Sequence, residues 1–165
     1  MVLRPFPPPS PDNHFLAGHA RLLDMSLRRL TGRGLVPDGV AAADVGRWLF
    51  EAPFAVLSHN TDPDPVFTYG NLTALSLFEL TWKELVRMPS RLSAEPLERA
   101  ERARMFKIVA VNGFVDNYAG VRISRTGRRF RITGGTVWTM RDDDGHNHGQ
   151  GATFSTWTFL ADATA

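Results

Sequence analysis

Residues 128–140 read RRFRITGGTVWTM, and this stretch decides the fold class. Apolar and polar side chains alternate along it with a period of two, which is the pattern of a strand with one buried face. The alternation predicts a single buried face made of Phe130, Ile132, Trp138 and Met140. The pair Gly134-Gly135 interrupts the strand and predicts a bulge or kink.

The sequence on either side of this stretch continues the same pattern. Residues 115–125 form a predicted strand that turns at Thr126-Gly127, and residues 149–160 form a predicted closing strand. The segment Asp142-Asp143-Asp144-Gly145 separates the last two strands, and Asp-Gly favours a hairpin turn there. The last third of the chain is therefore expected to be a three-stranded antiparallel meander.

The segments before residue 114 are mostly helical by periodicity. Strands are predicted at 54–58 and 66–69, and helices at 14–30, 40–51, 72–80, 81–88 and 95–112. Thr81 and Glu84 have the spacing of a capping box. This order predicts an α+β fold. It resembles the PAS fold, which implies a PAS-like five-stranded antiparallel sheet with helices across one face, here with an N-terminal helical extension.

Composition predicts one domain. The chain has 165 residues, 43% of them hydrophobic, and we expect a Pro-rich lead-in at 1–13, one domain at 14–160 that includes the N-terminal helices 14–51, and a tail at 161–165. The absence of cysteine excludes disulfides and cysteine-ligated metals. No apolar run is long enough for a membrane span and no secretory signal is visible, so a cytoplasmic location is expected. A net charge of +2 does not call for nucleic acid as a partner.

An ordered set of segments resembles a known family. It comprises RWLFEAPFAVLSHNTDPDPVFTYGN (47–71), LFELTWKEL (77–85), MPSRLSAEP (88–96), YAGVRISRTGRRF (118–130) and GQGATFSTW (149–157). Together they resemble the MEKHLA domain, a PAS-related module found alone in bacteria and algae and at the C-terminus of plant class III homeodomain–leucine zipper proteins. The resemblance covers roughly residues 14–159. It implies small-molecule sensing or protein–protein interaction, and it brings no catalytic motif.

The resemblance also bears on cofactors. PAS domains that form a flavin–thiol adduct need a cysteine, and the chain has none, so a covalent thiol-linked chromophore is excluded. Haem-binding PAS domains usually supply a histidine from the long helix, and residues 95–112 contain none, which disfavours haem. A non-covalent flavin or a small organic ligand stays open.

The fold implied by the resemblance places any pocket between the inner face of the sheet and the long helix. Candidate pocket residues are Tyr69, Asn71, Phe78, Met105, Phe106, Tyr118, Phe130, Trp138, Gln150 and Phe154, with Thr136 as a further polar group. Such pockets are mostly apolar with a few polar groups. The alternative is that the same side chains simply fill the core.

Polar clusters elsewhere support weaker hypotheses, and no metal site is predicted. Asp144 with His146 or His148 could hold a stray metal, but a solvated hairpin tip explains them as well. Asp62 and Asp64 fit a turn better than a calcium site, which needs about six oxygens. His59 and Asn60 are candidates for the mouth of the pocket.

The arginines have two interpretations. Five of them between Arg122 and Arg131 could bind a polyanion, or could be an exposed sheet edge protected by charge. On the predicted helix 95–112, Arg99, Arg102 and Arg104 alternate with glutamates, which predicts a solvated, self-paired face.

We therefore expect a non-enzymatic sensory or interaction module that acts through a separate partner protein and forms a homodimer. The N-terminal helix would either cap the sheet or form the dimer face. One alternative is a small α+β enzyme that uses Tyr118 and His59, which requires both to lie in a deep cavity. Another is a nucleic-acid-associated regulator that uses the arginine hairpin 122–131.

Overall fold

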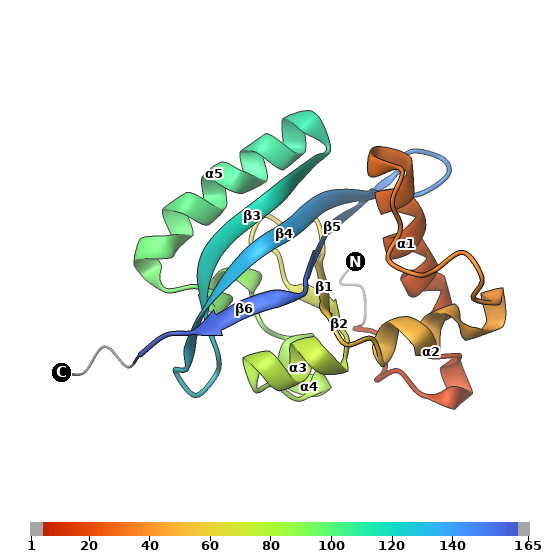
Figure 1. Ribbon diagram of the computed structural model, residues 1–165, viewed down its shortest axis with the longest axis horizontal. Coiled ribbons are helices and arrows are strands. Elements are labelled where there is room, and N and C mark those ends of the chain that lie inside the picture. Colours follow the sequence, from red (N-terminus) through yellow and green to blue (C-terminus); the bar gives the residue numbers. More distant parts are fainter. Residues whose placement is uncertain (1–4, 162–165) are drawn as a thin grey trace.

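The computed structural model describes residues 5–161, which are built around an antiparallel sheet (Figure 1). The sheet order is β2-β1-β5-β4-β3, and β6 pairs with β4. The strands are β1 (Ala55–His59), β2 (Phe67–Gly70), β3 (Phe114–Ile123), β4 (Arg129–Arg141), β5 (Asn147–Phe154) and β6 (Thr156–Phe159). Each expected strand is present, with bounds within a few residues of those predicted.

The closing strand, expected as one element over 149–160, is divided at Ser155 into β5 and β6. β5 pairs with β4 from Thr136 onward, and β6 pairs with residues 130–133 of the same strand. Because β3 occupies the other side of β4, β5 and β6 lie end to end along one edge. The sheet thus keeps the five-stranded arrangement that the sequence predicts.

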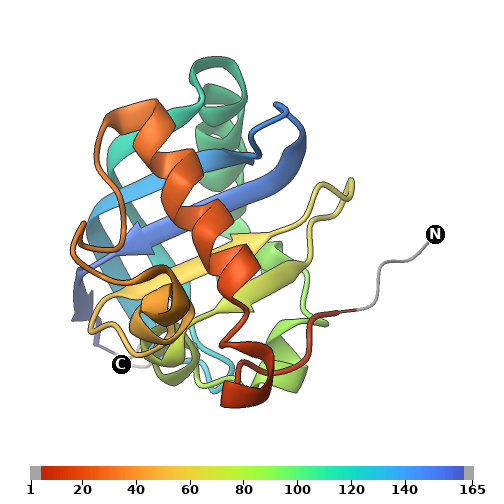
Figure 2. The ribbon, with the colours of Figure 1, turned by 90° about the vertical axis from the view of Figure 1, so that its right-hand side faces the viewer.

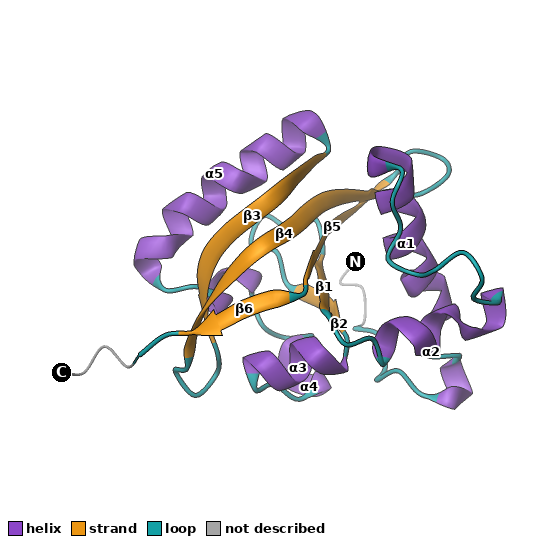
Figure 3. Cartoon of the chain, viewed as in Figure 1, coloured by secondary structure: helices purple, strands orange, loops and turns teal. Residues whose placement is uncertain are grey.

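Helices cover both faces of this sheet. α3 (Leu72–Phe78) and α5 (Pro96–Asn112) pack against one face, while α1 (Ala17–Thr31) and α2 (Val45–Phe50) pack against the other. The short α4 (Trp82–Leu85) lies beside β2. Figure 2 shows α1 running across the strands, and Figure 3 shows α5 on the opposite side. Of the two roles expected for the N-terminal helix, capping the sheet is the one observed.

Local signals in the sequence explain where the short helices begin. The Thr81 hydroxyl accepts a hydrogen bond from the Glu84 backbone N–H, and the Glu84 carboxylate accepts one from the Thr81 N–H, so the capping box is confirmed. Short 3-10 helices lie at Pro11–Asn13, Ala42–Asp44 and Ser90–Ser93. The predicted helix 14–30 begins only at Ala17, because His14, Phe15 and Leu16 form a left-handed turn.

The single buried face expected for residues 128–140 is wrong. Phe130 and Ile132 pack beneath α3, whereas Trp138 and Met140 lie on the opposite face against α1. Gly134 has a φ of +66° and sits at the break between the two halves of β4. Since strand residues alternate faces, one extra residue reverses every side chain beyond it. The glycine pair predicted the bulge, but not this reversal.

The N-terminal lead-in packs on the fold over the part that is described. The Phe6 carbonyl accepts a hydrogen bond of 2.9 Å from Trp82 Nε1, and the Phe6 ring lies 5.1 Å from the His19 ring. Residues 1–4 of the expected lead-in and 162–165 of the expected tail lie outside the described residues. Between residues 5 and 161, every helix is too short or too polar to cross a lipid bilayer.

Candidate functional site

A cavity of about 60 Å³ lies between the sheet and the helices α3 and α5. A buried water needs roughly 10–15 Å³ of such space, so the cavity has room for about four or five water molecules. Its apolar wall includes Leu57, Phe67, Phe78, Met105, Ile132 and Phe154. The cavity lies between the inner sheet face and the long helix α5, the region in which the fold implied by the resemblance would place a pocket.

The structure brings most of the predicted pocket residues to this cavity. Those that line it are Phe78, Met105, Phe106, Tyr118, Gln150 and Phe154. Thr136 also borders it, but its hydroxyl donates to Asp116 at 2.7 Å and is engaged outside the cavity. Phe130 lies behind the wall, where its ring meets that of Phe78 at 5.1 Å.

Three predicted pocket residues lie elsewhere. Tyr69 and Trp138 are on the far face of the sheet, where the Trp138 indole N–H donates to Ser26 at 2.9 Å. Asn71 is fully buried but turns its amide toward the backbone between β1 and α3. For Trp138 the reason is the β4 bulge, which reverses its side of the sheet.

His59 enters the cavity as a neutral side chain. Burial lowers its pKa to about 4, and its Nδ1 lies 2.9 Å from the Asn60 carbonyl oxygen. The Nδ1–H therefore donates to this carbonyl, which leaves Nε2 as a buried acceptor without a hydrogen-bond partner. The neighbouring Gln150 carbonyl oxygen is also buried without a partner. Gln150 raises the pKa of His59 slightly, yet no hydrogen bond of good geometry joins the two.

Two arginines that sequence reasoning placed in solvent line the cavity instead. Arg102 of α5 is 8% exposed and Arg122 of β3 is 7% exposed. Both predictions are corrected: Arg102 is not on a solvated helix face, and Arg122, although it belongs to the edge strand β3, has a buried side chain. Spacing could have revealed them, because Arg102 stands one helical turn before Met105 and Phe106, and Arg122 lies on the same strand face as Tyr118.

The remaining arginines of the hairpin are mostly engaged. Arg125 pairs with Glu84 at 3.1 Å, Arg129 pairs with Glu95, and the Arg128 guanidinium lies 3.9 Å from the centre of the Phe159 ring. With Arg122 in the cavity, the hairpin offers no uninterrupted row of free cations. The arrangement of these arginines therefore gives little support to the hypothesis that the hairpin binds nucleic acid.

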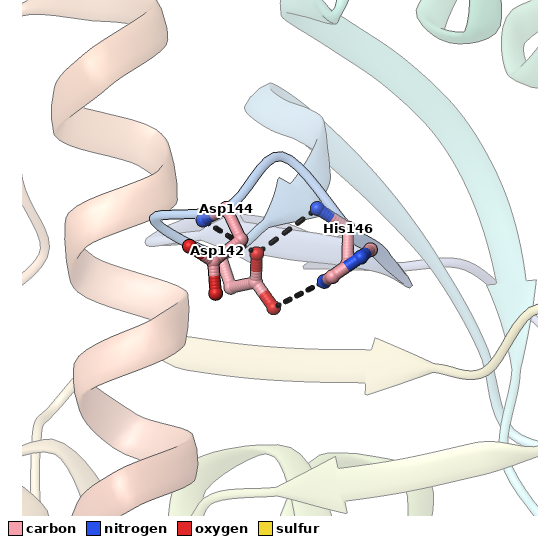
Figure 4. A group of neighbouring side chains, drawn as sticks. All are labelled: Asp142, Asp144 and His146. Atoms are coloured by element: carbon pink, nitrogen blue, oxygen red, sulfur yellow. Dashed lines mark hydrogen bonds and ion pairs between the residues drawn. The ribbon is translucent and has the colours of Figure 1, made fainter.

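The two loops with carboxylates are organised as turns. Asp142, Asp144 and His146 lie close enough to share an ion (Figure 4). However, the Asp142 carboxylate already accepts from His148 and from the backbone N–H groups of His146 and Asp144, which lowers its pKa to about 2. In the other loop, Asp64 pairs with Arg91 and the Asn60 side chain accepts from Asp62 and Val66. These contacts account for both clusters without a metal.

Sequence comparison identifies a family over most of the chain. The family model of the MEKHLA domain matches residues 17–159. Two homeobox-leucine zipper proteins of Arabidopsis thaliana are similar: ATHB-14 with 29% identity over 68% of this chain, and ATHB-9 with 29% identity over 62%. The matches cover 13% and 12% of those proteins, so the chain spans about an eighth of the length of these relatives.

Solved structures share the fold at low sequence identity. A PAS domain from Colwellia psychrerythraea has a TM-score of 0.56 and 10% identity, over 65% of this chain and 89% of that one. A light-oxygen-voltage domain studied with a flavin analogue has a TM-score of 0.56 and 13% identity, over 72% and 86%. The light-state dimer of the fungal photoreceptor Vivid has a TM-score of 0.55 and 14% identity, over 78% and 88%. The fold is therefore PAS-like, and the chain belongs to the MEKHLA domain family.

Proposed function

We propose that this MEKHLA domain is a non-catalytic sensory module that binds a small molecule in the cavity beneath α5. The cavity itself is the observation that carries the proposal. Its wall is largely apolar, and a few polar groups, among them His59, Gln150 and Arg102, reach it from different elements. Small-molecule sites commonly have this composition.

The size of the cavity limits the ligand. Pockets for drug-sized ligands have volumes of about 300–1,000 Å³, well above the 60 Å³ found here. A non-covalent flavin, which the sequence left open, does not fit unless α5 moves away from the sheet. We therefore favour a ligand with few non-hydrogen atoms.

The test is direct detection of a bound molecule, followed by blocking of the cavity. Native mass spectrometry and an absorbance spectrum of the freshly purified chain would reveal a copurified ligand. Ala152→Leu, which adds bulk to the cavity wall, should abolish retention of that ligand, whereas Ala119→Leu on the exposed part of β3 should not. Equal ligand retention by wild type and Ala152→Leu would contradict the proposal.

A catalytic role has one observation in its favour, because Tyr118 and His59 both line the cavity as the enzyme alternative requires. Their hydrogen bonds favour binding over catalysis. His59 bonds to the backbone of its own loop, and the Tyr118 hydroxyl accepts from Arg122. Among the described residues, no serine or threonine hydroxyl in the cavity bonds to His59 as an activated nucleophile would.

A separate partner protein would transmit the signal. We also propose that the chain forms the homodimer expected from its sequence. The Vivid structure is described as a dimer, which makes dimerisation a reasonable expectation for this fold. The face that α1 covers is not free for it, since Leu23 and Leu27 of that helix are buried in the core.

A further inference from the structure

We infer that the cavity takes a small organic carboxylate, whose negative charge lies between the guanidinium groups of Arg102 and Arg122. The inference rests on the proposed ligand-binding function and adds to it the chemical class of the ligand.

The two arginines are buried without an acidic partner. Within residues 5–161, each ion pair closer than 4 Å joins other side chains, and neither Arg102 nor Arg122 is in one. Asp64 acts on Arg102 only at longer range and is itself paired with Arg91. Buried charges in proteins are normally paired, because desolvation of an isolated ion is costly.

The groups that do contact these arginines are neutral. Arg102 donates to the Ser90 hydroxyl at 2.6 Å and lies 4.3 Å from the centre of the Phe106 ring. Arg122 donates to the backbone carbonyl of Val121 at 3.0 Å and to the Tyr118 hydroxyl. These contacts fix the orientation of both guanidinium groups but leave their positive charges without compensation.

The two charges also act on each other. Burial lowers the pKa of Arg102 to about 9, and repulsion from Arg122 contributes in the same direction. Arg102 is therefore still protonated at neutral pH, and together with Arg122 it gives the cavity two positive charges without an acidic partner. An anion bound between them would remove the repulsion and provide the missing counter-charge.

The other two unpaired polar groups of the cavity, His59 Nε2 and the Gln150 carbonyl oxygen, do not require a ligand. Rotation of the Gln150 amide by half a turn would exchange its oxygen and nitrogen, and His59 Nε2 could then accept from it. Those two side chains can therefore satisfy each other. Among the described residues, no acidic side chain pairs with Arg102 or Arg122, so the inference is based on these two charges.

A carboxylate fits the cavity better than an inorganic anion does. A carboxylate accepts two parallel N–H bonds from a guanidinium, and its hydrocarbon part can contact the apolar wall formed by Leu57, Phe78 and Phe154. Sulfate and phosphate would lose hydration against that wall. Room for about four or five waters corresponds to acids of about four to eight non-hydrogen atoms.

The experiment compares acids with their neutral amides. The full chain is freed of copurified ligand by dialysis from denaturant, and binding is measured by calorimetry at neutral pH. The probes are the straight-chain acids from acetate to hexanoate, malonate and succinate, each against its amide, with sulfate and phosphate as inorganic anions. We expect at least one acid to bind at least about tenfold more tightly than its amide, as charge-assisted hydrogen bonds allow.

Variants locate the effect. Arg102→Met and Arg122→Met keep an unbranched stem as long as the arginine chain up to Nε but remove the guanidinium charge. Both should remove the preference for acid over amide, and both should leave the ligand-free melting temperature unchanged or higher. Arg104→Met, on the exposed side of the same helix, should keep the preference. A purely structural role for Arg102 predicts the opposite: a lower melting temperature and an intact preference.

The outcomes separate this inference from the proposed function. Amides that bind as tightly as acids, or binding of sulfate and phosphate alone, would overturn the carboxylate assignment while the cavity would still be a ligand site. Retention of ligand by Ala152→Leu would instead remove the cavity from consideration, and the proposed function would fail with it.

Discussion

At the scale of single residues, Asn71 joins several segments through one buried amide. Its oxygen accepts from the backbone N–H groups of Val56 and Ala74, and its nitrogen donates to the carbonyls of Leu49 and Phe54. The predicted helix 72–80 begins directly after Asn71, and the structure shows that Asn71 caps α3. Its complete burial makes it a structural residue and not the ligand contact that was expected.

Replacement of Asn71 should therefore be severe. Asn71→Ala leaves several buried backbone groups without partners, and we expect it to lower the free energy of unfolding by about 3–5 kcal/mol. Urea unfolding followed by circular dichroism measures this. Asn112→Ala, at an exposed position at the end of α5, is the control and should change stability by less than about 0.5 kcal/mol. Equal effects of the two substitutions would show that burial of the amide is unimportant.

Two histidines, the buried His59 and the half-buried His19, should make stability depend on pH. Burial lowers the pKa of both His19 and His59 to about 4 in the folded chain, while the unfolded value is about 6.5. Below pH 6.5 the unfolded chain therefore binds more protons than the folded chain. Stability is complete above pH 6.5 and is lost as pH falls toward 4, by about 2 kcal/mol per histidine at pH 5.

Unfolding in urea at pH 7 and pH 5 checks this expectation. His59→Gln should reduce the difference between the two pH values by about 2 kcal/mol, and the exposed His14→Gln should leave it unchanged. A pH dependence that survives in the double variant His19→Gln/His59→Gln would assign the effect to other groups.

At the scale of elements, two helical glycines should respond oppositely to the same substitution. A Cβ on Gly46 of α2 would lie 2.4 Å from the His14 carbonyl oxygen, because the left-handed turn before α1 packs directly on this residue. A Cβ on Gly18 of α1 would meet nothing within 4 Å. The first glycine permits close packing of two elements, and the second only weakens a helix.

Gly46→Ala should thus destabilise the chain by about 1–3 kcal/mol through overpacking. Gly18→Ala should stabilise it by about 0.5–1 kcal/mol through helix propensity. Thermal unfolding of both variants beside wild type is sufficient. Stabilisation by both substitutions would mean that the turn at His14 moves freely away from α2.

Most elements could be predicted from the sequence because each has a local signal: alternation in β4, the capping box at Thr81, and the helical spacing before Asn112. The side of the sheet to which each residue of β4 points could not be predicted beyond Gly134. A period of two gives the correct side only if no extra residue interrupts the strand. The cavity residues Phe78, Met105 and Phe154 could be named because the fold implied by the family resemblance puts a pocket between the sheet and the long helix. Arg102 and Arg122 were missed because charged side chains are normally assigned to solvent, and only the packed structure shows these two to be enclosed.

At the scale of the whole molecule, the described surface leaves several apolar side chains exposed, including Ile108 and Val111 of α5. We expect a homodimer of the full chain, and size-exclusion chromatography with light scattering at micromolar concentration should give a mass near twice 18.4 kDa. Val111→Asp at the most exposed of these positions should shift the mass toward the monomer if α5 contributes to the contact. A wild-type chain that elutes only as an 18.4 kDa monomer would rule out dimerisation under these conditions.

The interruption at Gly134 has a counterpart that constrains how the chain can change in length. Thr133 faces Thr156 and Thr136 faces Thr153, so two residues separate the paired positions on each strand. Deletion of one residue from either strand alone would shift the pairing register by one position. The side chains beyond the deletion would then point to the opposite face of the sheet. Deletion of one residue from each together would preserve the pairing of β4 with β5 and β6, but it would remove the extra residue and move Trp138 and Met140 to the face that holds Phe130 and Ile132. The number of residues at this point is therefore fixed by which core each half of β4 must fill.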